Sequence, residues 1–210
     1  MASPAPSTRQ AGAWRATALL GRLQRNRRDK RMNDAANSPD IAGIRNAGLV
    51  LLHPFLPAMF QRLDLLATGG DGRPQLRGEH GAHAVHLLQY LVDGRSDAPE
   101  QQLLLNKLLC GLEPDFPAPP VDLGEEERAL CEQVLAAVMR HWPAVGQTSP
   151  EGLRQVFLQR EGRMQKGDGK CTLAVARNPF DVLLSRLPWN LAAIRHPWMP
   201  QPLLIDWPGA

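Results

Sequence analysis

The 210-residue chain is poor in cysteine, and its few cysteines form no recognisable pattern. Cys110, Cys131 and Cys171 stand far apart, their number is odd, and no C-x-x-C pair exists. This spacing argues against a disulfide framework and favours small, buried apolar residues in a protein from a reducing compartment. A disulfide is not needed either, because a body of about 170 residues buries on the order of 70% of the surface that its unfolded chain exposes.

Long apolar runs are also missing. The most apolar segment, residues 47–60, contains His53, Pro54 and Pro57, and it falls short of the ~20 apolar residues that span a bilayer. Residues 16–20 are too few for the apolar core of a secretory signal. We therefore expect no membrane partner and no secretory leader.

What the chain does have is a basic N-terminus ahead of a near-neutral body. Residues 1–40 hold eight Lys or Arg and three Asp, a net charge of +5, whereas the rest holds 16 basic and 18 acidic side chains, a net charge of −2. With 43% hydrophobic and 21% charged residues, the composition is typical of a soluble globular protein. We expect residues 1–45 to form a basic, flexible N-terminal tail and residues 46–207 to form a globular domain.

The basic side chains of this tail are candidates for partner binding. They are Arg22, Arg25, Arg27, Arg28, Lys30 and Arg31. Such a cluster can bind nucleic acid or an acidic protein surface through simple attraction and counterion release. A solvated linker is the alternative, because like charges repel each other and stay unfolded.

Apolar residues recur every three or four positions in several segments, which predicts amphipathic helices. The first covers residues 49–63 and should kink or restart at Pro54, because proline has no N–H donor and clashes with the preceding turn. Two others cover about residues 80–92 and 99–110.

A fourth helix starts where Asp122 stands three residues before Glu125, the spacing of a capping box. Its inward face is predicted to carry Leu130, Val134, Leu135, Val138 and Trp142. A fifth helix begins at Ser149-Pro150, where a capping hydroxyl is followed by proline at the first helical position.

Beyond residue 160 the apolar period changes from 3.6 to 2. Residues 162–176 predict a β-hairpin, a short helix begins at Asn178-Pro179, and residues 203–207 suggest a third strand. The predicted fold is α+β and mostly α-helical, with a helical bundle-like core and a small, late antiparallel hairpin or sheet.

Three histidines, His80, His83 and His86, form the one cluster that resembles a metal site. His83 and His86 are close enough on a helix to share an ion, although a third ligand would have to come from elsewhere. The alternative is exposed or half-buried histidines at a helix start. The sequence has no H-E-x-x-H, G-x-S-x-G or G-x-x-x-x-G-K-[ST] motif. We therefore predict no metal, no cofactor and no enzymatic activity.

Three tryptophans near the C-terminus, Trp189, Trp198 and Trp207, each stand next to a proline. A segment with this many prolines cannot be one regular element. Its rings either anchor an irregular chain over the core or offer flat, rigid contact area to a partner. We therefore include all three among the candidate partner-binding residues.

Several segments of the chain resemble, in the same order, the blocks of a known family. They are residues 46–57 (NAGLVLLHPFLP), 84–92 (AVHLLQYLV), 105–112 (LNKLLCGL), 141–143 (HWP), 152–162 (GLRQVFLQREG), 181–189 (DVLLSRLPW) and 197–200 (PWMP). Together they resemble the C-terminal domain of contractile injection system tape measure proteins, which are components of phage-tail-like particles. The resemblance spans about residues 46–207 and carries no catalytic residues.

The resemblance implies a structural component that determines tube length or that helps to template or terminate the tube. Its partners would be inner tube, baseplate or cap proteins, with no small-molecule substrate and no nucleic acid. It would be cytoplasmic during assembly and then part of an extracellular or cell-associated particle. The residues alone leave an alternative open, a basic-tailed module that binds nucleic acid or protein without catalysis.

The chain departs from that family in one respect. Family members generally have a long N-terminal region, whereas here about 45 residues precede the first block. Even if fully helical, those residues would reach only roughly 70 Å, which is short for a ruler along a long tube. We expect a truncated or specialised relative that keeps the docking domain.

Overall fold

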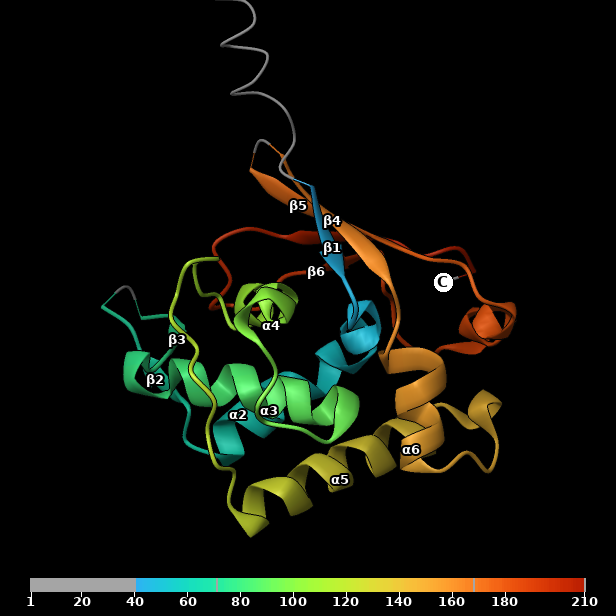
Figure 1. Cartoon of the computed structure of the whole chain (residues 1–210), viewed down its shortest axis with the longest axis horizontal. Helices are drawn as coiled ribbons and strands as arrows, with labels where there is room; N and C mark the ends of the chain where they lie inside the picture. Colours follow the sequence, from blue (N-terminus) through green and yellow to red (C-terminus); the bar gives the residue numbers. More distant parts are fainter. Residues whose placement is uncertain (1–40, 71, 168, 210) are drawn as a thin grey trace, which may run out of the picture. The chain divides into compact units, whose positions relative to one another are not determined.

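A five-stranded mixed sheet lies against a set of mostly short helices (Figure 1). The structure is a computed structural model that describes residues 41–70, 72–167 and 169–209. The strand order in the sheet is β1 (Ile41–Ile44), β4 (Gly162–Gly167), β5 (Lys170–Val175), β7 (Leu203–Asp206) and β6 (Ala193–Ile194). Neighbouring strands are antiparallel except for β5 and β7, which are parallel.

The predicted hairpin at residues 162–176 is confirmed as β4 and β5. Its inward residues alternate as a half-buried strand requires, with Cys171, Leu173 and Val175 buried on β5. The suggested third strand is confirmed as β7, in which Ile205 stands opposite Leu173.

The predicted fold class is wrong, because it assigns too much of the core to helices and too little to the sheet. Helices of all types account for 47% and strands for 17% of the described residues, and the sheet is five-stranded and mixed. The protein is therefore a fairly balanced α+β structure rather than a helical bundle with a late hairpin. The sequence signal for β1 and β6 is weak because four-residue and two-residue strands are too short for a period to be visible. Strand β1 also places residues 41–44 in the sheet, N-terminal to the predicted domain start at residue 46.

The first predicted helix does restart near Pro54, but its first part is a 3₁₀ helix. Segment η1 (Ala47–Phe55) contains Pro54, and α2 (Leu56–Arg62) follows it. Gly48 explains the close packing of η1, because a Cβ atom there would lie 1.6 Å from the backbone oxygen of Phe157. Only glycine fits this approach of two backbones.

One predicted helix agrees closely with the structure, and the next is divided into two shorter elements. Helix α3 (Gly81–Asp93) ends at Gly94, whose φ of 73° provides the left-handed C-cap that favours glycine. The segment predicted at residues 99–110 is split into the 3₁₀ turn η3 (Glu100–Gln102) and α4 (Leu104–Leu109).

Helix α5 (Glu125–His141) carries the predicted apolar face but is capped differently. The Glu127 carboxylate accepts the backbone N–H of Gly124 at 2.7 Å, while Asp122 accepts a hydrogen bond from Arg128 at 2.9 Å. The predicted Asp122–Glu125 capping box is therefore wrong, because the helix begins two residues later than it requires.

The remaining elements are short. Ser149 caps α6 (Pro150–Leu153) as predicted, since its hydroxyl accepts the N–H of Gly152 at 3.1 Å. A π-helical turn, η5 (Arg154–Leu158), follows directly. The others are β2 (Leu66–Thr68), β3 (Pro74–Leu76), η2 (Gly78–His80), η4 (Pro143–Val145) and η6 (Pro179–Arg186).

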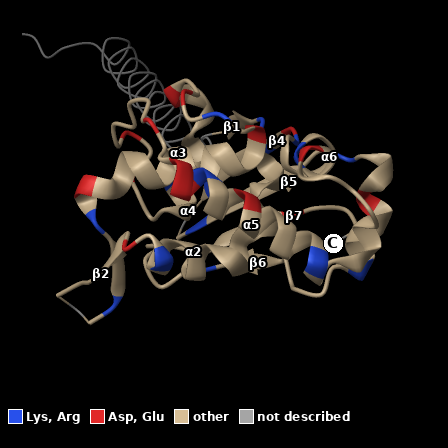
Figure 2. Ribbon diagram, turned by 90° about the horizontal axis from the view of Figure 1, so that it is seen from below, with Lys and Arg blue, Asp and Glu red and all other residues tan. Residues whose placement is uncertain are grey.

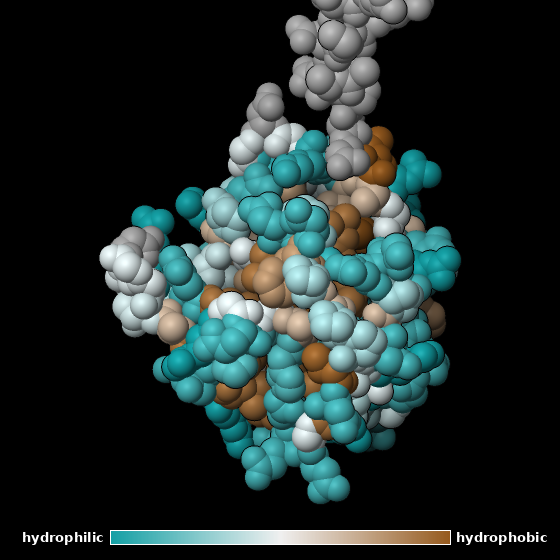
Figure 3. Space-filling view, turned by 60° about the vertical axis from the view of Figure 1, so that its left-hand side comes forward, coloured by the Kyte–Doolittle hydropathy of each residue, from teal (hydrophilic) through white to brown (hydrophobic). Residues whose placement is uncertain are grey.

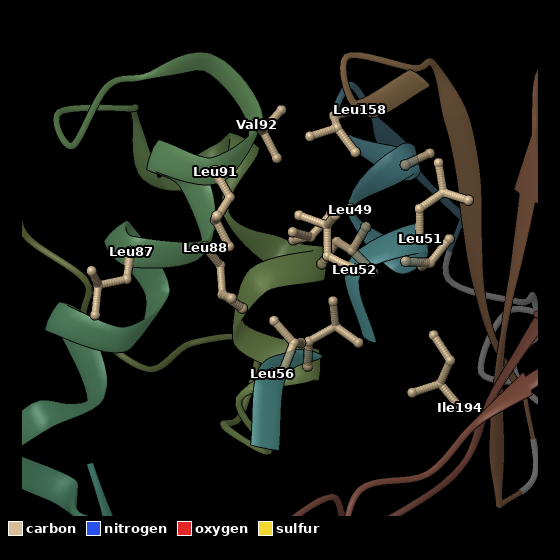
Figure 4. Packing of buried hydrophobic residues seen from close by; sticks show 14 of the residues in the cluster. Leu49, Leu51, Leu52, Leu56, Leu87, Leu88, Leu91, Val92, Leu158 and Ile194 are labelled. Carbon is tan, nitrogen blue, oxygen red and sulfur yellow. The ribbon is translucent and has the colours of Figure 1, made fainter. Parts of the chain in front are cut away.

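The core is built around η1 (Figure 4). Leu49 and Leu52 are turned towards Leu88 of α3, while Leu51 lies on the side of Ile194 in β6. All five side chains are buried. Through these contacts η1 connects the helical layer to the sheet. Burying each leucine stabilises the fold by roughly 1.5–3 kcal/mol.

Candidate docking surfaces

The six basic residues between Arg22 and Arg31 that were predicted to bind a partner lie outside the described residues. Their role stays a prediction. In the described part, positive and negative side chains are interspersed along the chain, as Figure 2 shows. This agrees with the near-neutral charge expected of the body.

The tryptophan segment lies over the helical core. Trp189 is half-buried, donates its indole N–H to the carbonyl of Leu51 at 3.1 Å and meets Phe55 edge-on, with ring centroids 5.4 Å apart. Trp198 is 8% exposed and donates to the carbonyl of Leu109 at 2.9 Å. Trp207 is 4% exposed. All three rings thus anchor an irregular chain, and partner binding by them stays a prediction that depends most on the exposed part of Trp189.

Trp207 belongs to a buried polar cluster that the sequence analysis did not identify. The Arg160 guanidinium lies 5.3 Å from the Trp207 ring and forms two hydrogen bonds with the Asp181 carboxylate, at 2.8 and 3.2 Å. Burial opposes ionisation of Asp181, but Arg160 and the backbone N–H of Asn178 outweigh it and hold the pKa of that carboxyl below its usual range. This cluster fixes the C-terminal segment to the start of β4.

The two histidines considered as metal ligands have separate partners. His83 Nε2 contacts the carboxylate of Glu127, whereas His86 is buried with its Nε2 at 3.1 Å from the carbonyl of Ala118. Within the described ranges, no group of three or more His, Cys, Asp or Glu residues lies where it could hold a metal ion. His83 and His86 therefore serve packing and helix contacts in this structure.

The cysteines are buried free thiols. Burial raises the pKa of Cys110, and it raises the pKa of Cys131 to about 12. A thiol in such surroundings stays protonated at neutral pH and is a poor nucleophile. All three cysteines are buried, as expected, and the Cys171 sulfur also accepts a hydrogen bond from Gln201 Nε2 at 3.1 Å.

An apolar groove of about 440 Å³ lies between α4 and the sheet. Its apolar lining includes Leu104, Leu108 and Leu112 on one side and Ala42 and Met164 on the other. Figure 3 shows apolar patches interrupted by polar residues on the face of the molecule that includes the left-hand side of Figure 1. Two further apolar side chains, Phe180 and Val182 on η6, are exposed elsewhere.

A second hollow of about 650 Å³ lies where β3, the end of α4 and residues 195–200 meet. Buried His196 lines it, stacks on Trp198 at 4.7 Å and has no hydrogen-bond partner for Nε2 within the described structure. Burial, reinforced by the neighbouring His53, lowers the pKa of His196 to about 4. His196 is therefore neutral at physiological pH.

A polar cleft of about 460 Å³ has in its lining two of three buried side-chain amides that hydrogen-bond to one another. The amides belong to Asn46, Gln89 and Asn106, which come from the residue before η1, from α3 and from α4. They do not stand out in the sequence, because a polar residue within a helix is normally assigned to the outer face. The available signal was that Gln89 and Asn106 directly follow inward leucines.

None of the helices in the described ranges is both long and apolar enough to cross a bilayer.

Comparison with known proteins identifies one family. A family model described as contractile injection system tape measure protein matches residues 4–207. No curated protein and no solved structure matches the chain. The match begins well before residue 46, so it includes residues 4–45 as well as the folded unit. The chain belongs to the contractile injection system tape measure protein family.

Proposed function

We propose that this protein is a non-enzymatic assembly component of a contractile injection particle that takes part in determining tube length or in assembling and terminating the tube. The observation that carries the proposal is the family match over residues 4–207. Membership implies interaction with other components of such a particle. The proposed partners are inner tube, baseplate or cap proteins, met in the cytoplasm during assembly and retained in the finished particle.

The contacts of the buried charged side chains support a non-enzymatic role. Lys107 is buried and donates to Glu100 at 2.7 Å and to the carbonyl of Pro114 at 3.0 Å, which ties α4 to the segments on either side of it. Arg160 and Asp181 neutralise each other in the core. These charged groups are engaged in contacts that stabilise the fold.

We further propose a division of labour along the chain. Residues 41–209 fold alone and dock on a particle protein, while the positive charge of residues 1–40 binds an acidic surface of a tube or baseplate component. Strand β1 sets this boundary, because truncation beyond residue 40 would remove the partner of β4.

The first experiment deletes the gene and images particles by electron microscopy. We expect few particles or an altered length distribution, restored by the full chain but not by residues 41–210. Thermal unfolding of the shortened chain should match that of the full chain. Normal particle yield and length after deletion would contradict the proposed function, and unchanged assembly with the shortened chain would contradict the division of labour.

A second experiment distinguishes a protein that measures the length of the tube (a ruler) from one that ends its growth (a terminator). Helix-forming repeats are inserted after residue 39, outside the folded unit. A ruler should lengthen the tube by up to about 1.5 Å for each added helical residue. A terminator should leave the mean length unchanged, and the deletion strain should then produce a broad length distribution.

A further inference from the structure

The three buried amides form a hydrogen-bonded network. Contacts outside the network fix which way the amides of Asn106 and Gln89 are turned. Asn106 Nδ2 donates to the carbonyl of Val85 at 3.0 Å, and Gln89 Nε2 donates to the Asp93 carboxylate at 2.6 Å. Both acceptors lack a proton to donate, so each amide must turn its nitrogen towards them. The oxygens of Asn106 and Gln89 consequently face inward, towards Asn46.

The single amide nitrogen of Asn46 donates to both of these acceptor oxygens. Its Nδ2 donates to Asn106 Oδ1 at 2.6 Å and to Gln89 Oε1 at 3.1 Å. The Oδ1 atom of Asn46 is left buried, with no donor among the residues that the structure describes. A buried acceptor without a partner costs about 1–3 kcal/mol, so a donor that reaches this atom would be stabilising.

The lining of the cleft supplies more acceptors around Asn46. Gln159 donates its Nε2 to the carbonyl of Val92 at 3.1 Å, which leaves its amide oxygen free to accept. Two carboxylates, Asp93 and Glu161, line the same cleft, and Arg45 is the one basic residue in the lining. The charged residues in the lining therefore sum to a net charge of −1, and the amide of Gln102 is a further polar group there.

We propose that this cleft binds a lysine or arginine side chain of a partner protein in the particle. A cationic side chain brings several N–H donors, which suits the oxygens of Gln159 and Glu161 in a lining that also includes Asn46. A bare metal ion fits less well, because both Asp93 oxygens already accept N–H donors, from Gln89 and from the backbone of Arg95. The inference rests on the proposed assembly function and adds the chemistry of one docking contact.

The test uses the full chain labelled with ¹⁵N and a minimal probe, acetyl-Gly-Lys-Gly-amide, with acetyl-Gly-Gln-Gly-amide as the neutral counterpart. We expect saturable NMR shifts of the side-chain amides of Asn46 and Gln159 with the lysine peptide alone. Glu161→Gln should weaken binding about threefold, whereas Arg45→Gln should strengthen it by a similar factor, because each removes one partly screened charge. Glu126→Gln, an exposed carboxylate on α5, is the matched control and should change nothing.

Equal shifts with both peptides, or no shift at Asn46 and Gln159, would overturn the inference. So would a crystal structure of the peptide-saturated chain in which a water molecule alone contacts Asn46 Oδ1. In particles, Glu161→Lys should reduce incorporation several-fold more than Glu126→Lys. Because the peptide titration needs no particle, its failure leaves the proposed function intact, while normal particles after gene deletion would remove that function without altering the titration.

Discussion

The helical region and the C-terminal segment of this protein reach the same core by different means. Helices α3 and α5 follow from their own apolar period, and each buries one face. Residues 188–209 contain only two short strands and are held by distant groups. The Trp189 and Trp198 indoles donate to carbonyls of η1 and α4, which come much earlier in the chain.

The difference lies in where the specifying interactions come from. A periodic helix depends on many weak apolar contacts, so each residue contributes a share of the burial energy. An irregular segment satisfies few backbone groups internally, so it depends on individual polar anchors. Disruption of one anchor should therefore affect the C-terminal segment at least as strongly as a cavity affects the helical region.

The largest expected effect is at the Arg160–Asp181 pair, which anchors the C-terminal segment because the Arg160 guanidinium lies 5.3 Å from the Trp207 ring. Asp181→Ala should lower the free energy of unfolding by about 3–5 kcal/mol, because Arg160 stays buried without its counter-ion. Urea denaturation measures the loss. Arg160→Met combined with Asp181→Ala should recover part of it, since the double variant has no unpaired charge.

The matched control for that anchor is the exposed ion pair between Arg95 and Asp97, at 2.9 Å. Asp97→Ala should cause a far smaller loss, because water screens this pair and solvates the arginine that remains. Equal losses at Asp181 and Asp97 would contradict the view that burial makes the difference.

A cavity in the helical region is the next largest perturbation. Leu88 on α3 is fully buried, and Leu88→Ala should destabilise the protein by about 3 kcal/mol through lost burial and a residual cavity. Leu88→Met keeps the volume and should cost less than about 1.5 kcal/mol. Hydrogen exchange should report the Leu88→Ala loss throughout the core, since η1 packs on both the helices and the sheet.

These two regions also differ in how much of them the sequence could predict. The ranges of α3, α5 and the β4–β5 hairpin were predictable because period and turn residues are local signals. The pairing of β1 with β4 and the parallel pairing of β5 with β7 were not, since they join segments far apart in sequence. The strong helix pattern before residue 142 therefore led to an overestimate of the helical character of the core.

The candidate sites also divide into features that the sequence could predict and features that only the fold creates. The tryptophans were predictable as notable residues, but the sequence could not decide between anchoring and partner contact, because their hydrogen-bond acceptors lie up to 138 residues away. The polar cleft was not predictable, because Asn46, Gln89 and Asn106 come from three segments and only the fold brings their amides together.

A smaller effect is expected from acidification, through the histidine in the C-terminal segment. The folded-state pKa of His196 is lowered to about 4, whereas the unfolded value is about 6.5. Between these values the unfolded chain binds more protons, so stability falls as pH decreases from about 6.5 to about 4 and is unaffected by this group above that range. Allowing for solvent screening, we expect a loss of up to about 2 kcal/mol from this residue.

Urea midpoints at pH 7, 5.5 and 4.5 measure this dependence. His196→Gln cannot titrate and should flatten the corresponding part of the profile. A wild-type profile that matches the His196→Gln profile would show that His196 does not contribute.

The smallest expected effect on stability is on the outer side of the C-terminal half. Phe180 and Val182 on η6 are 52% and 71% exposed, so little burial is lost when either is replaced. Phe180→Ser and Val182→Ser should each change the free energy of unfolding by no more than about 0.5 kcal/mol, the usual range for surface positions. Asp181 lies between them and faces the core, so neighbouring residues should differ several-fold in effect. Particle incorporation of the two serine variants is the informative second measurement: a decrease at unchanged stability would place η6 in a docking surface, and a large loss of stability would contradict the separation of an anchored inner side from an available outer one.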